Sequence, residues 1–168
     1  MNKICFSGYR PEKFPFSVEA DNPTLLILKL KLQEEVRKAV KEDGAVFYSG
    51  MQRGFDILAA EAVLELKSKC ENVNLVCVLP FKGFVVGGLW ENRFRKLIQF
   101  ADEIVTISNL PSKWAFLARN DYIVSHAETA IVFYDGKHGG SEYTVRKAYE
   151  NGLNVINLAS VTHERSAE

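Results

Sequence analysis

Three glycine-bearing turns contain the residues of this sequence that are best suited to bind a charged ligand. They span residues 8–11, 49–54 and 135–141, and each follows a short apolar run and precedes a helix-like segment. In a parallel sheet all strand-to-helix turns lie at one end, so the three turns are expected to converge there. Free amides at the starts of helices favour anions. The three turns therefore predict one pocket for a phosphate-bearing ligand.

The first turn offers an aromatic ring and a guanidinium after Gly8. Arg10 can bind a phosphate or carboxylate through two parallel hydrogen bonds, and Tyr9 could stack on a base. The alternative for Arg10 is a surface arginine that fixes its own loop. A long connection separates this turn from the next helix, and the GxGxxG fingerprint is absent. The sequence thus disfavours a standard dinucleotide-binding dehydrogenase.

The second turn combines small residues with a carboxylate. Ser49, Gly50 and Gly54 offer a hydroxyl and bare amides to an anion. Asp56 follows in the first turn of the expected helix. It either accepts hydrogen bonds from ligand hydroxyls, such as a ribose diol, or only complements the helix dipole.

The third turn is the richest in glycine. Gly139 and Gly140 would let the backbone approach a ligand closely, and Ser141 is expected to cap the next helix. Asp135 and Glu142 are candidate acids or bases. A glutamate in a first helical turn more often complements the dipole, so both interpretations of Glu142 stay open.

Other catalytic motifs are missing from the sequence. The histidines are scattered, so no metal site is predicted, and neither GxSxG nor GxxxxGK[ST] occurs. Residues 80–88 combine glycines with aromatic residues. They would form either a lid over a bound ring or a loop packed against the domain or a second subunit.

Alternating apolar runs and helical stripes must position these turns. Strands are expected at residues 3–7, 45–49, 74–79, 103–107, 129–134 and 154–158, with helical periodicity between them. Ser112 and Ser141 stand where two helices should begin. The pattern predicts a Rossmann-like, doubly wound α/β fold, with a mostly parallel sheet of about six strands and helices on both faces. We expect a single domain over residues 1–158 and a polar tail over 159–168.

Composition narrows the class of protein. The 21 basic and 21 acidic residues balance, which argues against nucleic acid as a partner. The sequence shows neither a signal peptide nor an apolar run of membrane-spanning length, so we expect a soluble, cytoplasmic protein without a membrane partner. Homo-oligomerisation stays open, because four aromatic residues are expected to be exposed and could cover a partner: Phe14, Phe16, Phe84 and Trp114.

The motifs, taken in order, resemble the YpsA-like branch of the SLOG superfamily over about residues 3–158. They are Gly8-Tyr9-Arg10-Pro11, Ser49-Gly50-Met51 with Gly54 and Asp56, Pro80-Phe81, Trp90 with Arg93, Arg119-Asn120, and Tyr134-Asp135-Gly136 with Gly139-Gly140. The resemblance implies a Rossmann-like fold that binds nucleotides or nucleotide-derived ligands, with no certain cofactor.

Two better-understood relatives suggest further roles. LOG-type phosphoribohydrolases carry an arginine before a helix, then a strand, then GGxGTxxE. Arg119 and Gly139-Gly140 match that order, so the resemblance gives Arg119 a phosphate-binding or catalytic role. The second GT and the later glutamate are missing, which leaves Glu142 as a possible substitute for the lost carboxylate. DprA-type relatives bind single-stranded DNA.

The leading hypothesis is a domain that binds or senses a nucleotide-derived small molecule. The first alternative is a hydrolase of N-glycosidic or phosphate-ester bonds. Arg119 would position the phosphate there, and Glu142, Asp135 or Asp56 would serve as acid or base. The second alternative is a single-stranded DNA binder, which zero net charge disfavours.

Overall fold

The computed structural model describes residues 1–159, so nearly all of the tail predicted over 159–168 lies outside the described residues. The strands are β1 Asn2–Ser7, β2 Ala45–Ser49, β3 Val73–Phe81, β4 Glu103–Ser108, β5 Thr129–Val132 and β6 Asn154–Asn157. The helices are α1 Pro23–Ala39, α2 Phe55–Lys67, α3 Glu91–Phe100, α4 Lys113–Ser125 and α5 Gly140–Glu150, with short 3₁₀ turns at Pro11–Lys13 and Gly88–Trp90.

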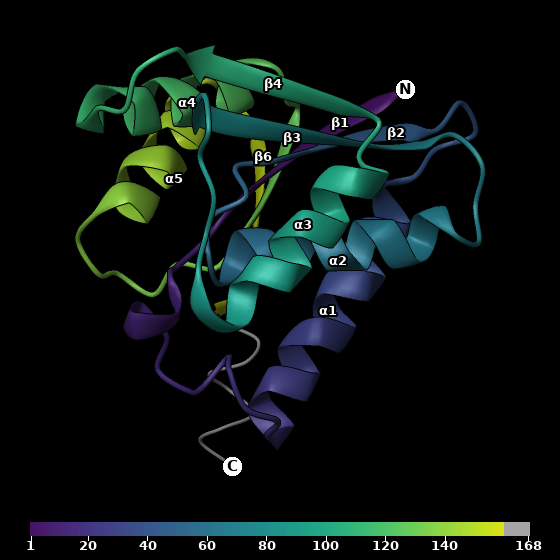
Figure 1. Ribbon diagram of the computed structural model, residues 1–168. Helices are drawn as coiled ribbons and strands as arrows, with labels where there is room; N and C mark the ends of the chain where they lie inside the picture. The colour runs from purple at the N-terminus through teal and green to yellow at the C-terminus, as the bar shows by residue number, and fades with distance from the viewer. Residues whose placement is uncertain (160–168) are drawn as a thin grey trace.

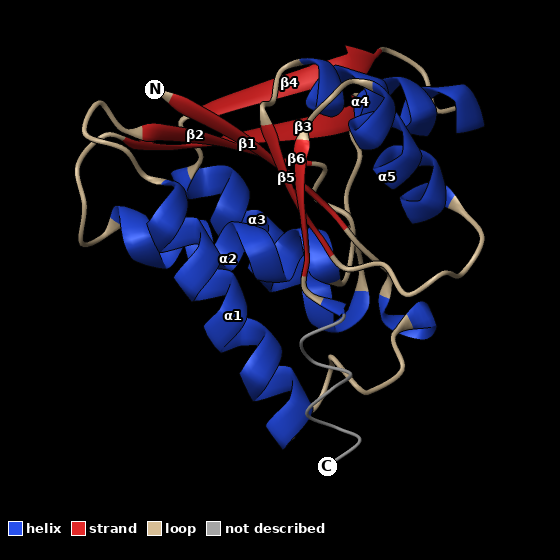
Figure 2. Ribbon diagram, turned by 180° about the vertical axis from the view of Figure 1, so that it is seen from behind, coloured by secondary structure: helices blue, strands red, loops and turns tan. Residues whose placement is uncertain are grey.

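The strands form one sheet in the order β4-β3-β2-β1-β5-β6, and every pairing is parallel. The helices α1, α2 and α3 cover one face, and α4 and α5 cover the other (Figures 1 and 2). The chain moves outward from β1 to β4 and then returns to place β5 on the other side of β1. The predicted doubly wound fold is confirmed. Its strand order reverses between β1 and β5, where such folds bind ligands.

Side-chain caps explain where two helices begin. Asn22 accepts a hydrogen bond from the amide of Leu25 at 2.9 Å, with Pro23 in the first helical position of α1. Ser112 accepts from the amide of Ala115 at 3.1 Å, which confirms the cap predicted for α4.

The cap predicted at Ser141 is wrong. Helix α5 already begins at Gly140, because Gly139 turns the chain with a φ of 141° that favours glycine. Ser141 therefore lies inside the first helical turn. Its hydroxyl donates to the carbonyl of Gly8 at 2.8 Å, so it ties α5 to the end of β1.

Two of the aromatic residues expected on the surface are buried instead. Phe14 and Phe84 are each 8% exposed, whereas Trp114 is 66% exposed. Phe84 packs edge-to-face against Phe81, Phe94 and Phe116. The loop over residues 80–88 is thus anchored against the domain by its own aromatic side chain. Among residues 1–159, no helix combines the length and apolarity that a membrane crossing requires.

Candidate functional site

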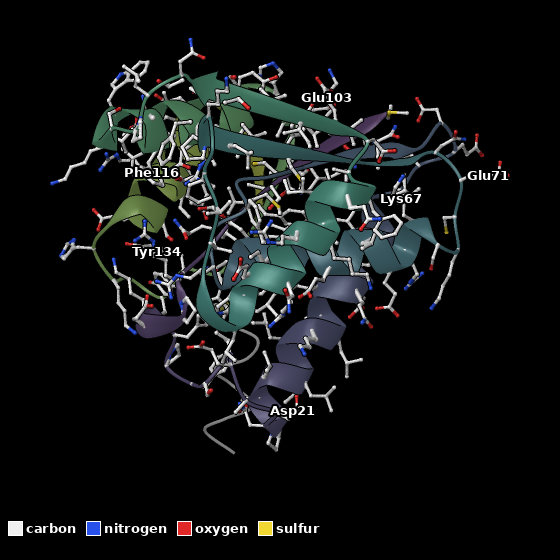
Figure 3. All side chains as sticks on the ribbon, in the orientation of Figure 1. Asp21, Lys67, Glu71, Glu103, Phe116 and Tyr134 are labelled. Atoms are coloured by element: carbon white, nitrogen blue, oxygen red, sulfur yellow. The ribbon has the colours of Figure 1, made fainter. Side chains whose placement is uncertain are left out.

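A cavity of about 530 Å³ lies at the point where the strand order reverses. The end of β1, the turn after β2, helix α4 and the start of α5 form its walls. Phe116 of α4 is one of the lining residues and is labelled in Figure 3. The predicted site residues that line the cavity are Gly8, Arg10, Gly50, Asp56, Arg119, Gly140 and Ser141. The predicted turns therefore meet in one place.

The other predicted site residues do not line the cavity: Tyr9, Ser49, Gly54, Asp135, Gly139 and Glu142. Most of them hold the turns in place. Tyr9 is only 1% exposed, so its ring is not available to stack on a base as predicted. The reason is that its ring packs edge-to-face against Phe14 and Phe133 in the core.

The hydroxyl of Tyr9 organises the third turn instead. It donates to a carboxylate oxygen of Asp135 at 2.6 Å and accepts from the amides of Asp135 and Lys137 at 3.0 and 3.1 Å. Burial and the bond to Asp135 raise the pKa of Tyr9, which keeps the phenol protonated as a donor. Asp135 is therefore a partner of Tyr9 in the turn.

Ser49 holds the second turn together, and Gly54 lets it approach the first. The hydroxyl of Ser49 donates to the carbonyl of Asp56 at 3.0 Å and accepts from the amide of Met51 at 3.2 Å. Gly54 has a φ of 93°, and a Cβ there would lie 2.4 Å from the carbonyl oxygen of Tyr9. Only glycine meets both conditions. The two residues do not line the cavity but stabilise the turn that carries Gly50.

Arg119 enters the cavity from α4 and is only 6% exposed. Its Nη1 donates to the carbonyl of Gly50 at 2.7 Å, and its Nε donates to the side chain of Asn120 at 3.1 Å. These bonds hold the planar group in one orientation. A fixed guanidinium recognises phosphate well, because little side-chain entropy is lost on binding.

Asp56 and Arg119 both approach the place where Gly50 lacks a side chain. A Cβ on Gly50 would come within 3.0 Å of Arg119 Nε and 3.1 Å of Asp56 Oδ2. The carboxylate also accepts from the amide of Gln52 at 3.2 Å. Glycine at position 50 thus lets both charged groups reach the same cavity.

Burial raises the pKa of Asp56 to about 6, although Arg119, the Gln52 amide and Arg10 all favour the charged form. Burial likewise lowers the pKa of Arg119, and the charge of Asp56 opposes that shift. Asp56 therefore titrates close to neutral pH, in a range useful for proton transfer.

Replacing Asp56 with asparagine should make the protein's stability less dependent on pH. The folded-state pKa is above the ordinary value of 3.8, so the folded state binds the proton more tightly than the unfolded state. The wild type should consequently lose stability as pH rises from about 4 to about 6, by at most about 3 kcal/mol. Thermal unfolding of both proteins from pH 4 to pH 8 measures this. Parallel curves would contradict the buried, titrating carboxyl.

Cationic side chains dominate the lining. Arg10, Lys13, Lys113 and Arg119 line the cavity, and Asp56 is the one carboxyl group among its lining residues. The start of α5 adds the positive end of a helix dipole. The cavity is therefore suited to an anion even though the charges of the whole chain balance.

Sequence reasoning missed most of the wall that α4 provides. Lys113, Phe116, Leu117 and Asn120 line the cavity, and their spacing of three, four and seven residues places them on one helical face. The same spacing, read from the sequence beside Arg119, could have identified these residues as cavity-lining.

Glu142 lies outside the cavity. Its carboxylate contacts His138 Nδ1 at 2.6 Å in the exposed part of the third turn. The α5 residues that line the cavity are Gly140, Ser141 and Thr144, and helical periodicity turns Glu142 away from that face. The structure does not bring Glu142 together with Arg119.

One protein-family model and several curated proteins match most of this chain. The family model YpsA, described as the YspA SLOG family, matches residues 4–162. A UPF0398 protein of Brevibacillus brevis is 24% identical over 100% of this chain and 96% of its own length. A UPF0398 protein of Bacillus pumilus is 29% identical over 90% of this chain and 83% of its own.

A solved structure of DNA processing protein A from Helicobacter pylori, described for its single-stranded DNA binding mode, shares the fold. Its TM-score is 0.61 at 21% sequence identity, over 93% of this chain. This chain spans 64% of that longer protein.

Proposed function

Because the chain belongs to the YspA SLOG family, we propose that it binds a nucleotide or nucleotide-derived ligand in the cavity between α4 and α5. One observation carries the proposal: four cationic side chains and the start of a helix converge on the cavity. Its volume of about 530 Å³ lies within the range of small-ligand pockets.

Residues that line the cavity are suited to each part of such a ligand. The phosphate is expected near the start of α5, where Gly140 and Ser141 line the cavity beside Arg10. Arg119 is already fixed to receive a phosphate oxygen. Asp56 would accept hydrogen bonds from ribose hydroxyls. Phe116 and Leu117 supply the apolar surface for a base.

A thermal-shift and calorimetry screen with AMP, ADP, NAD and ADP-ribose tests the proposal. At a hundred times the dissociation constant, a ligand should stabilise the fold by about 2.7 kcal/mol, or roughly 5 to 10 °C. Arg10→Ala should abolish that shift, since Arg10 is an exposed cation at the cavity. Arg95→Ala is the matched control, because Arg95 pairs with Glu91 on α3 away from the cavity. Equal affinity in all three proteins would refute the proposed pocket.

The same samples separate the two other hypotheses. Single-stranded DNA is added to the screen because the structural neighbour DNA processing protein A binds it, although the likeness to that protein extends to the fold alone. Hydrolysis of an N-glycosidic bond would add water across that bond and release free base, which chromatography detects. If it occurs, we assign the acid–base role to Asp56, since Glu142 lies outside the cavity.

A further inference from the structure

Strand β4 forms one edge of the sheet. Among residues 1–159, its outer side has no neighbouring strand. Figure 1 shows β4 at the upper rim, and Figure 3 shows the side chain of Glu103 there. Glu103, Ile104 and Thr106 are exposed. An edge strand presents unpaired backbone groups and is a template for another strand.

The backbone direction identifies which groups face outward. The backbone amide of Asp102 donates to the carbonyl of Leu75, and the backbone carbonyl of Ser108 accepts from the amide of Lys82, both at 2.9 Å. The backbone groups of the even-numbered residues therefore face β3. Because the backbone alternates along a strand, the amides and carbonyls of Glu103, Val105 and Ile107 face outward.

This edge lacks the usual protection against pairing. Residues 103–108 contain neither proline nor lysine, and the register with β3 runs without a bulge from Glu103 to Ser108. Four large apolar side chains lie in β4 or within six residues of it in the sequence. They are exposed to between 46% and 74%: Phe100, Ile104, Leu110 and Trp114. Four such residues in and beside one edge strand favour an interaction surface over scattered exposure.

We propose that β4 pairs antiparallel with β4 of a second copy of this chain, about a two-fold axis at Val105. This register places Glu103 opposite Ile107 of the partner subunit and pairs all outward-facing backbone groups. Glu103 is the one charged residue of the strand, and the register keeps it away from its own copy. In this antiparallel arrangement both subunits use the same surface, and the assembly ends with the dimer. A parallel pairing of the same two edges does not have this two-fold symmetry.

The flanking side chains supply the remaining contact area. A standard interface buries about 800 Å² per partner, which is more than six strand residues provide. Phe100 precedes β4, Ile104 lies at its beginning, and Leu110 and Trp114 follow its end. The antiparallel arrangement brings the beginning of one strand beside the end of the other, so both flanks become covered.

A matched pair of variants at one position tests the proposal. Both Ile107→Glu and Ile107→Lys introduce a charge at the same half-buried site, so they cost the monomer a similar amount. In the proposed register, glutamate would face Glu103 of the partner subunit and lysine would pair with it. Analytical ultracentrifugation of the full chain at 1–100 µM should show a wild-type dimer. Ile107→Glu should dissociate at least tenfold more readily than Ile107→Lys.

Two further variants complete the test. Adding Glu103→Lys to Ile107→Glu should restore the dimer, because the charges then match again. Leu26→Ala removes an apolar side chain of α1 that is 57% exposed, as the side chains beside β4 are, and it should leave the dimer unchanged. A monomeric wild type at 100 µM, or equal effects of glutamate and lysine at position 107, would overturn the proposal. Nucleotide binding in each variant is measured separately, so either proposal can fail alone.

Discussion

Replacing Arg119 with alanine should weaken binding of the nucleotide ligand by about 100-fold, since a charged hydrogen bond contributes about 1.5–3 kcal/mol. Arg119 is buried and held by Gly50 and Asn120, so its orientation is set before the ligand arrives. Its removal should also raise the pKa of Asp56 above 6, because the charge of Arg119 favours the ionised carboxylate.

Arg119→Lys is the informative companion variant. Lysine keeps the positive charge but loses the planar fork that reaches the Gly50 carbonyl and a phosphate together. Calorimetric titration should therefore place its affinity between wild type and Arg119→Ala. Circular dichroism and unfolding curves show whether each variant is folded. Wild-type affinity in a folded Arg119→Ala protein would exclude this arginine from the site.

Replacing Gly8 with alanine should destabilise the protein by about 2–3 kcal/mol, in the upper part of the usual cost of overpacking a closely packed core. A Cβ at position 8 would lie 2.3 Å from Cγ of the Phe55 ring. Phe55 cannot move away easily, because it is fully buried and its amide donates to the carbonyl of Tyr9 at 3.0 Å.

Thermal unfolding measures this effect, with an expected fall in melting temperature of roughly 5 to 10 °C. Gly87→Ala is the matched control. No atom lies within 4 Å of a Cβ at position 87, and the φ of Gly87 is −110°, which alanine adopts readily. The control should unfold within about 0.5 kcal/mol of wild type. Equal melting temperatures for Gly8→Ala and Gly87→Ala would contradict the close contact between the first two turns.

The amino-acid sequence by itself determined the layered fold. Apolar runs bounded by turns predicted all six strands, and the helical stripe of Leu25, Leu28, Leu32 and Val36 is buried in α1 as its spacing requires. Such patterns repeat within a few residues, so local periodicity is sufficient to reveal them. The convergence of the three turns also followed, because parallel strands bring their carboxyl ends together.

Only the tertiary structure decided which polar groups reach the cavity. Tyr9 and Glu142 looked like site residues in the sequence, yet one is buried against the core and the other contacts His138. Arg119 and Asp56 lie 63 positions apart in the sequence, and both approach Gly50 in the folded chain. The direction of a side chain depends on contacts between distant segments. Residue type and spacing therefore identify the turns, and packing selects the groups that face a ligand.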